Sequence, residues 1–258
     1  MKKTLIGTAF GIVAATAAQA TPISIQEFSF AAFNDATANA LAIEDFEDAS
    51  TLLTPAGFRD GGQVSTDGLN RTFGEINDTI VSSSVGSFST IANPGVGTGS
   101  TCRSLSGGLG NCDNIALQFD PALNGQGNIL PEPGQYALNS NDTLGLSWVA
   151  ELAGGGLFNQ LVFALRDAAD NKATLTVDTG TASASFSNLG NNNEQLFVVD
   201  LGALVSSATI TLSNSRINDG FTFDGAAITV APVPLPAAAW MLLAGLGGMA
   251  LLRRRANV

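Results

Sequence analysis

The feature that most constrains this chain is a long uncharged segment close to its C-terminal end. No charged residue occurs in 225–252, and the part 237–252 (AAAWMLLAGLGGMALL) is almost purely apolar. Counted from Val233, about twenty residues at a helical rise of about 1.5 Å give about 30 Å, the thickness of the hydrocarbon core of a bilayer. Three arginines follow at once: Arg253, Arg254 and Arg255. By the positive-inside rule these arginines stay in the cytoplasm, so we expect one transmembrane helix with the preceding domain on the outer side of the membrane.

A short proline motif lies directly before the apolar segment. It consists of Val233, Pro234, Leu235, Pro236 and Ala237. Two prolines hold the backbone extended and prevent the helix from continuing backwards. An extended, unpaired segment at a membrane surface is a conformation that a protease can bind. The order of proline motif, apolar helix and arginine cluster therefore indicates a cleavable sorting signal rather than an ordinary anchor.

The stretch VPLPAAAWMLLAGLGGMALLRRR resembles the VPLPA variant of PEP-CTERM sorting domains. The parent motif has Pro-Glu-Pro where this chain has Pro-Leu-Pro, which places the chain with the variant. Such tails are substrates of exosortases, which are transpeptidase-like membrane enzymes of Gram-negative bacteria. The resemblance implies recognition at 233–237, cleavage near that motif and transfer of the product to the cell surface or an extracellular matrix. Family members are often linked with exopolysaccharide and biofilm material.

The N-terminal end has the three parts of a secretory signal peptide. Two lysines form a positive start, an uncharged and mostly apolar stretch follows, and Ala18 and Ala20 supply the small residues that signal peptidase requires. We expect a signal helix that is cleaved before Thr21, because the stretch is too short and too rich in alanine to span a bilayer well. The chain then divides into a signal peptide (1–20), an exported domain (21–231) and a sorting tail (232–258).

The exported domain is strongly acidic. All 22 acidic residues of the chain but only 6 of its 11 basic residues lie in 21–231, so the domain has a net charge of −16. Such a surface repels nucleic acid and anionic lipid headgroups, which excludes nucleic-acid partners. The charge favours solubility outside the cell, and it can attract divalent cations.

Short segments with β character follow one another at turn-sized intervals through the domain. The low charged fraction and the abundance of Gly, Ser, Thr and Asn favour strands and turns over helices. We expect an all-β, two-sheet antiparallel sandwich that resembles a jelly roll, with phenylalanines in its core and an extended surface loop at 86–110. The predicted strand segments are 23–33, 42–46, 79–90, 115–119, 143–151, 159–166, 173–177, 182–186, 195–201, 208–212 and 221–230.

Two cysteines, Cys102 and Cys112, enclose a loop rich in glycine and serine. In an exported protein this pattern indicates one disulfide. Closing so short a loop stabilises a protein by roughly 2–3 kcal/mol in the chain-entropy model. The alternative, a metal site, would need further ligands, and the chain contains no histidine.

Two acidic clusters near the ends of the domain are candidates for a calcium site. Glu44 and Glu47 belong to the first cluster, where Asp45 and Glu47 would share one face of a strand. Asp219 and Asp224 belong to the second. First and last strands are commonly neighbours in jelly rolls, so oxygen ligands from both clusters can meet and hold one Ca²⁺. The arrangement resembles the structural calcium site of carbohydrate-binding jelly rolls, and the alternative is a solvated acidic edge that prevents aggregation.

The absence of histidine excludes Ser-His-Asp and Cys-His catalysis and His-rich zinc centres. The remaining enzymatic interpretation is a pair of carboxylates, as in glycoside hydrolysis. We expect no enzyme but a non-catalytic surface or matrix protein, processed by signal peptidase and an exosortase-type enzyme. It would be held in the inner membrane with its domain in the periplasm until it is released. The alternatives are a carbohydrate-binding module that binds the surrounding exopolysaccharide and a hydrolase that acts on it.

Overall fold

The computed structural model describes residues 22–47, 80–91, 136–140, 143–169, 172–191, 194–215 and 220–231. It also describes the backbone of five further strands within 53–119. Thr21–Ala231 form one compact unit. Residues 1–20 and 232–258 lie outside the described residues.

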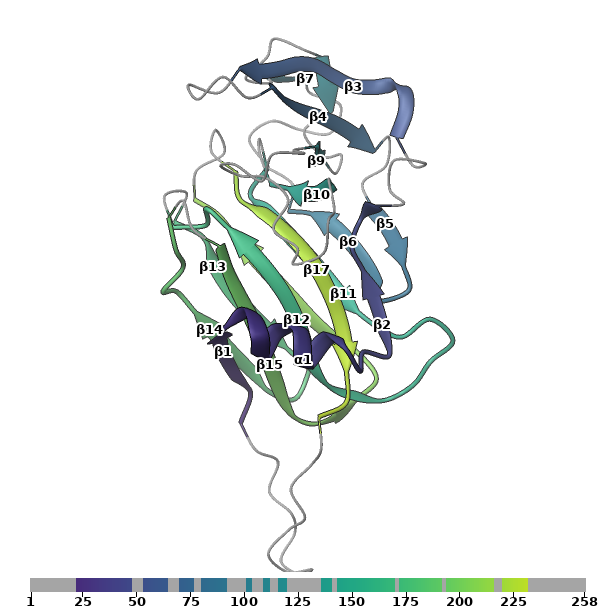
Figure 1. Ribbon diagram of the computed structural model, residues 1–258, viewed down its shortest axis with the longest axis vertical. Coiled ribbons are helices and arrows are strands. Elements are labelled where there is room, and N and C mark those ends of the chain that lie inside the picture. Colours follow the sequence, from purple (N-terminus) through teal and green to yellow (C-terminus); the bar gives the residue numbers. More distant parts are fainter. Residues whose placement is uncertain are drawn as a thin grey trace, which may run out of the picture. The chain divides into compact units, whose positions relative to one another are not determined.

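Two antiparallel sheets make up most of this unit, as expected for an all-β protein (Figure 1). In spatial order, the larger sheet contains β1 (Ser24–Phe28), β15 (Glu194–Val205), β12 (Phe158–Arg166), β17 (Thr222–Thr229), β10 (Tyr136–Asn139), β9 (Ala116–Phe119), β4 (Asn70–Ile76) and β3 (Leu53–Val64), while β2 (Ala42–Glu44) also pairs with β17. The smaller sheet contains β14 (Ser183–Phe186), β13 (Thr174–Asp178), β16 (Ala208–Ser213), β11 (Gly145–Ala150), β6 (Gly86–Thr90) and β5 (Ile80–Ser83). A separate hairpin joins β7 (Thr101–Arg103) and β8 (Leu109–Asn111).

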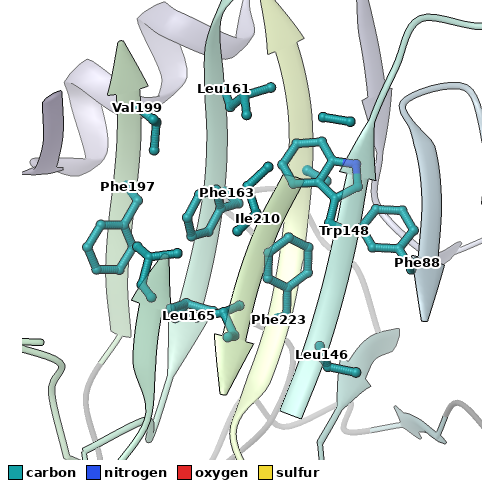
Figure 2. Packing of buried hydrophobic residues seen from close by; sticks show 14 of the residues in the cluster. Phe88, Leu146, Trp148, Leu161, Phe163, Leu165, Phe197, Val199, Ile210 and Phe223 are labelled. Atoms are coloured by element: carbon teal, nitrogen blue, oxygen red, sulfur yellow. The ribbon is translucent and has the colours of Figure 1, made fainter. Parts of the chain in front are cut away.

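The facing sides of the two sheets form one hydrophobic core, to which both contribute aromatic rings. Trp148 of the smaller sheet stacks on Phe88 at 5.6 Å and meets Phe163 of the larger sheet edge-on at 6.3 Å between ring centroids (Figure 2). Phe163 in turn stacks on Phe223 at 5.3 Å. The buried indole N–H of Trp148 donates to the carbonyl oxygen of Val85 at 3.0 Å. The prediction of a phenylalanine-rich core is therefore confirmed.

A short helix, α1 (Phe30–Thr37), occupies part of a segment that was expected to be a strand. The strand β1 ends at Phe28, and the Ser29 hydroxyl then accepts the Ala32 N–H and caps the helix. Phe33 is fully buried in a second cluster, against β12, β15 and β17 on the outer side of the larger sheet. The prediction of a strand over 23–33 is wrong from Phe30 onward. Ile23 and Ile25, before the Ser29 cap, alternate as in a strand, and this alternation hid the change to the helical period that follows.

Residues 86–90 were predicted both as part of a strand over 79–90 and as the start of a surface loop at 86–110, and the loop prediction is wrong there. These residues form β6, which pairs with β11 and places Phe88 in the core with 1% of its surface exposed. Gly86 adopts a φ of +112°, and a Cβ there would overlap with the carbonyl oxygen of Val149. Gly86 thus permits close approach of two strands. The predicted strand over 79–90 is two strands, β5 and β6, with a turn at 84–85.

Candidate functional site

The residues expected to direct export and sorting lie outside the described residues. These are the signal peptide with Ala18 and Ala20, the motif 233–237, the apolar segment 237–252 and the arginines 253–255. In the part of the chain that the structure describes, no helix is long and apolar enough to cross a membrane. The expected signal helix and transmembrane helix therefore stay predictions.

Ala231, the residue before Pro232 and the tail motif, is held at both of its backbone groups by one side chain. The Ala231 N–H donates to the Asn159 Oδ1 at 2.8 Å, and the Asn159 Nδ2 donates to the Ala231 carbonyl oxygen at 3.2 Å. Asn159 is 4% exposed, so its side chain replaces a strand partner where β17 has ended. The motif at 233–237 begins two residues after this clamp. No signal in the sequence indicated the clamp, because the two residues are far apart along the chain.

The two acidic clusters of the calcium hypothesis approach each other through the sheet. β2 pairs with β17, so Glu44 lies opposite Ala226, close in register to Asp224. This is the neighbourhood of early and late strands that the hypothesis required. Asp219 lies outside the described residues.

The carboxylates of the first cluster hold backbone amides. Glu44 Oε1 accepts the Phe46 N–H at 2.8 Å, and Asp45 Oδ1 accepts the Glu47 N–H at 3.2 Å. Glu47 Oε1 accepts the Tyr136 N–H of β10 at 2.8 Å. Because β2 ends at Glu44, Asp45 and Glu47 belong to a turn, and the expectation that they share one face of a strand is wrong.

This acidic turn inserts one phenylalanine between the sheets. Phe46 has a φ of +58°, a left-handed conformation that few non-glycine residues adopt, and it is 1% exposed. Its ring meets Phe88 edge-on at 5.1 Å and Phe223 at 6.4 Å between centroids. The carboxylate bonds at Glu44 and Asp45 hold the backbone in the unusual turn that the ring requires.

Asp224, the residue of the second acidic cluster that the structure describes, is hydrogen-bonded to the backbone. Asp224 is fully buried, and its Oδ1 accepts the Gly225 N–H at 2.7 Å. No three Asp, Glu or Cys side chains among the described residues lie close enough to hold a metal ion. A site that includes Asp219 stays a prediction, as does its alternative, a solvated edge. A rise of the melting temperature on adding calcium would support a calcium site, and an unchanged melting temperature would contradict it.

The predicted disulfide is only partly within the described residues. Cys102 lies in β7, opposite Gly110 of β8, in a hairpin whose register keeps 101–103 beside 109–111. Cys112 follows β8 immediately but lies outside the described residues. The hairpin brings the chain that precedes Cys112 next to Cys102, and the disulfide itself stays a prediction.

A hydrolase would need two carboxyl groups that face each other, one of them with a raised pKa. Partial burial raises the pKa of Glu194 above its usual value, and the charge of Arg166 opposes this shift. The residue opposite Glu194 in the sheet is Arg166, not a second carboxylic acid. This pair on its own is therefore not the constellation that glycoside hydrolysis requires.

Comparison with known proteins adds no assignment, because no family model and no curated protein matches the chain.

Proposed function

We propose that this chain is an exported protein which an exosortase-type enzyme processes near its C-terminal end and delivers to the cell surface or an extracellular matrix. The observation that carries the proposal is the ordered combination of the proline motif at 233–237, the apolar segment 237–252 and the arginines 253–255. Signal peptidase and the exosortase-type enzyme are the processing partners. The inner membrane holds the chain between the two cleavages, with the domain in the periplasm.

The place where the domain ends supports this proposal. Ala231 is held by Asn159, and Pro232 separates it from the motif. A domain boundary after Ala231 would make the motif available as a separate peptide substrate. A membrane-bound transpeptidase can then act on the peptide while the two sheets stay folded.

The domain is proposed to be a non-catalytic sandwich of the jelly-roll type. Pairing of the early strand β2 with the last strand β17 and the non-sequential strand order of both sheets support this topology. The roles of Glu44, Glu47 and Asp224 as acceptors of backbone N–H groups support a structural use of its acids. Hydrolysis of an exopolysaccharide that is lost on replacing single acids would instead favour the enzymatic alternative.

The sorting step is tested with proline variants in a Gram-negative host that has an exosortase. Pro234→Ala combined with Pro236→Ala should leave the signal-cleaved chain in the inner-membrane fraction, because the extended motif is lost. Pro232→Ala is the matched control, since it removes a neighbouring proline outside the motif, and its product should leave the membrane like the unaltered chain. Equal release, or equal retention, of all three forms would refute the proposal.

A further inference from the structure

The outer face of the smaller sheet carries two rows of residues that cross its six strands. The strand register defines the first row as Ser185, Thr176, Thr211, Ser147, Ser89 and Ile80. It defines the second row as Ser183, Asp178, Thr209, Val149, Ser87 and Ser82. All but Ile80, Asp178 and Val149 carry a hydroxyl group, and we name these two rows the hydroxyl face.

The hydroxyl face is accessible, and its only charge is that of Asp178. Every residue of the two rows is exposed or half-exposed, while the alternate residues of the same strands, such as Trp148 and Ile210, are buried in the core. The outer side of the larger sheet differs, because α1 covers apolar residues there. In a domain with a net charge of −16, this face thus concentrates neutral donors and acceptors.

Two hollows lie along the second row, one beside β13 and β16 and the other beside β5 and β6. One, of about 480 Å³, is lined by residues that include Asp178, Thr176 and Thr209. The other, of about 650 Å³, is lined by residues that include Ser82, Ser87 and Glu151. From Asp178 on β13 to Ser82 on β5, the row covers four strand spacings, which is about 19 Å. On β11, Val149 of the second row and Ser147 of the first row lie between the two hollows, so the hollows and the two rows form a track across the strands for an extended molecule.

The chemistry of this track selects a neutral, hydroxyl-rich polymer. Serine and threonine hydroxyls both donate and accept, as sugar hydroxyls do, and the carboxylates of Asp178 and Glu151 can accept from hydroxyl groups in the hollows. No basic side chain lies in the two rows to bind an anion. We propose that the hydroxyl face binds a neutral polysaccharide that lies across the strands. This inference rests on the proposed function for its setting, since a matrix protein meets such polymers outside the cell.

Binding on this face should depend on many weak contacts. The rows contain no aromatic ring on which a sugar can stack, so hydrogen bonds have to provide the affinity. Each hydroxyl that is lost should weaken binding by about 2- to 12-fold, the range for one net hydrogen bond. A polymer engages several positions at once and is bound measurably, whereas a monosaccharide is not.

The test is affinity electrophoresis of the full chain in a sugar-free non-ionic detergent, through gels that contain dextran, hydroxyethyl cellulose or alginate. A neutral polymer should retard the protein, and retardation should persist in high salt because no ion pair is involved. Thr176→Val combined with Thr211→Val keeps β-branched residues on the strands and should weaken retardation by about 5-fold or more. Ser24→Val, on β1 of the larger sheet, is the matched control and should leave it unchanged.

Failure to retard in both neutral polymers would overturn this inference, as would retardation in alginate alone or an equal loss in the control variant. A melting temperature for each variant shows that it is folded. Processing of the tail is read separately, from the mass of the mature chain. Binding without processing therefore removes only the sorting pathway, and processing without binding removes only the hydroxyl face.

Discussion

Replacement of Phe46 by alanine tests whether the acidic turn serves to place an aromatic ring in the core. The ring is 1% exposed and contacts Phe88 and Phe223 from both sheets. Truncation of a buried phenylalanine costs about 3–5 kcal/mol through lost transfer energy and the cavity left behind. The left-handed backbone strain is similar for alanine and phenylalanine, so no gain offsets this loss. We expect the free energy of unfolding of Phe46→Ala to fall by about 3–5 kcal/mol.

Guanidinium unfolding followed by tryptophan fluorescence measures this loss, since Trp148 stacks on Phe88 next to the altered ring. For a domain of this size the melting temperature should fall by about 6–20 °C. Phe30→Ala is the matched control, because Phe30 is 52% exposed and its truncation should change stability by less than about 0.5 kcal/mol. A loss below about 1 kcal/mol for Phe46→Ala would refute the packing described for this turn.

A double-mutant cycle tests the role of the carboxylate. Glu44 accepts the N–H of Phe46, so Glu44→Ala should destabilise the unaltered chain by about 1 kcal/mol or more. In the Phe46→Ala background the same change should cost less, with a coupling energy of about 0.5 kcal/mol or more. Strictly additive effects would show that the carboxylate acts independently of the ring.

Three further predictions concern the end of the domain, a close strand contact and one titrating group. Asn159→Ala should destabilise the domain by about 1–2 kcal/mol in denaturant unfolding, because both backbone groups of Ala231 lose their partner. Gly145→Ala should lower the free energy of unfolding by at least about 2 kcal/mol, since φ is +127° and a Cβ would overlap with a carbonyl oxygen of β16. The control Gly154→Ala has open space around its Cβ and should lower it by about 1 kcal/mol. Partial burial raises the pKa of Glu194 despite the opposing charge of Arg166, so the stability it provides is complete below its unfolded pKa of about 4.3 and is lost as the pH rises through its native pKa. Glu194→Gln should therefore melt higher than the unaltered chain at pH 7 but not at pH 3, and a reversed order would contradict this.

The strands with strict alternation could be predicted from the sequence. Leu146 and Trp148, separated by one serine, mark β11, and Leu175 and Val177 mark β13 in the same way. Both strands have one buried and one exposed face, which is the condition under which period-two alternation arises. The all-β class and the phenylalanine core followed from the same pattern.

Other elements depend on contacts that a local pattern does not contain. The helix α1 is held by Phe33 against the outer side of the larger sheet, so its apolar residues serve a different surface from those of β1. Phe46 lies on a turn with a positive φ. For this reason, the spacing of its acidic neighbours, Asp45 and Glu47, wrongly predicted that both lie on one face of a strand. The hydroxyl face is visible in the sequence as Thr-x-Thr and Ser-x-Ser steps, but the register of six strands is needed to join them into rows.

The central claim, that the C-terminal tail is a sorting signal, is tested most directly by intact-mass spectrometry of the protein recovered from the cell surface or medium. The account predicts a chain that begins at Thr21 and ends within or next to 233–237. A mature chain that still carries Arg253, Arg254 and Arg255 through to Val258 would contradict it.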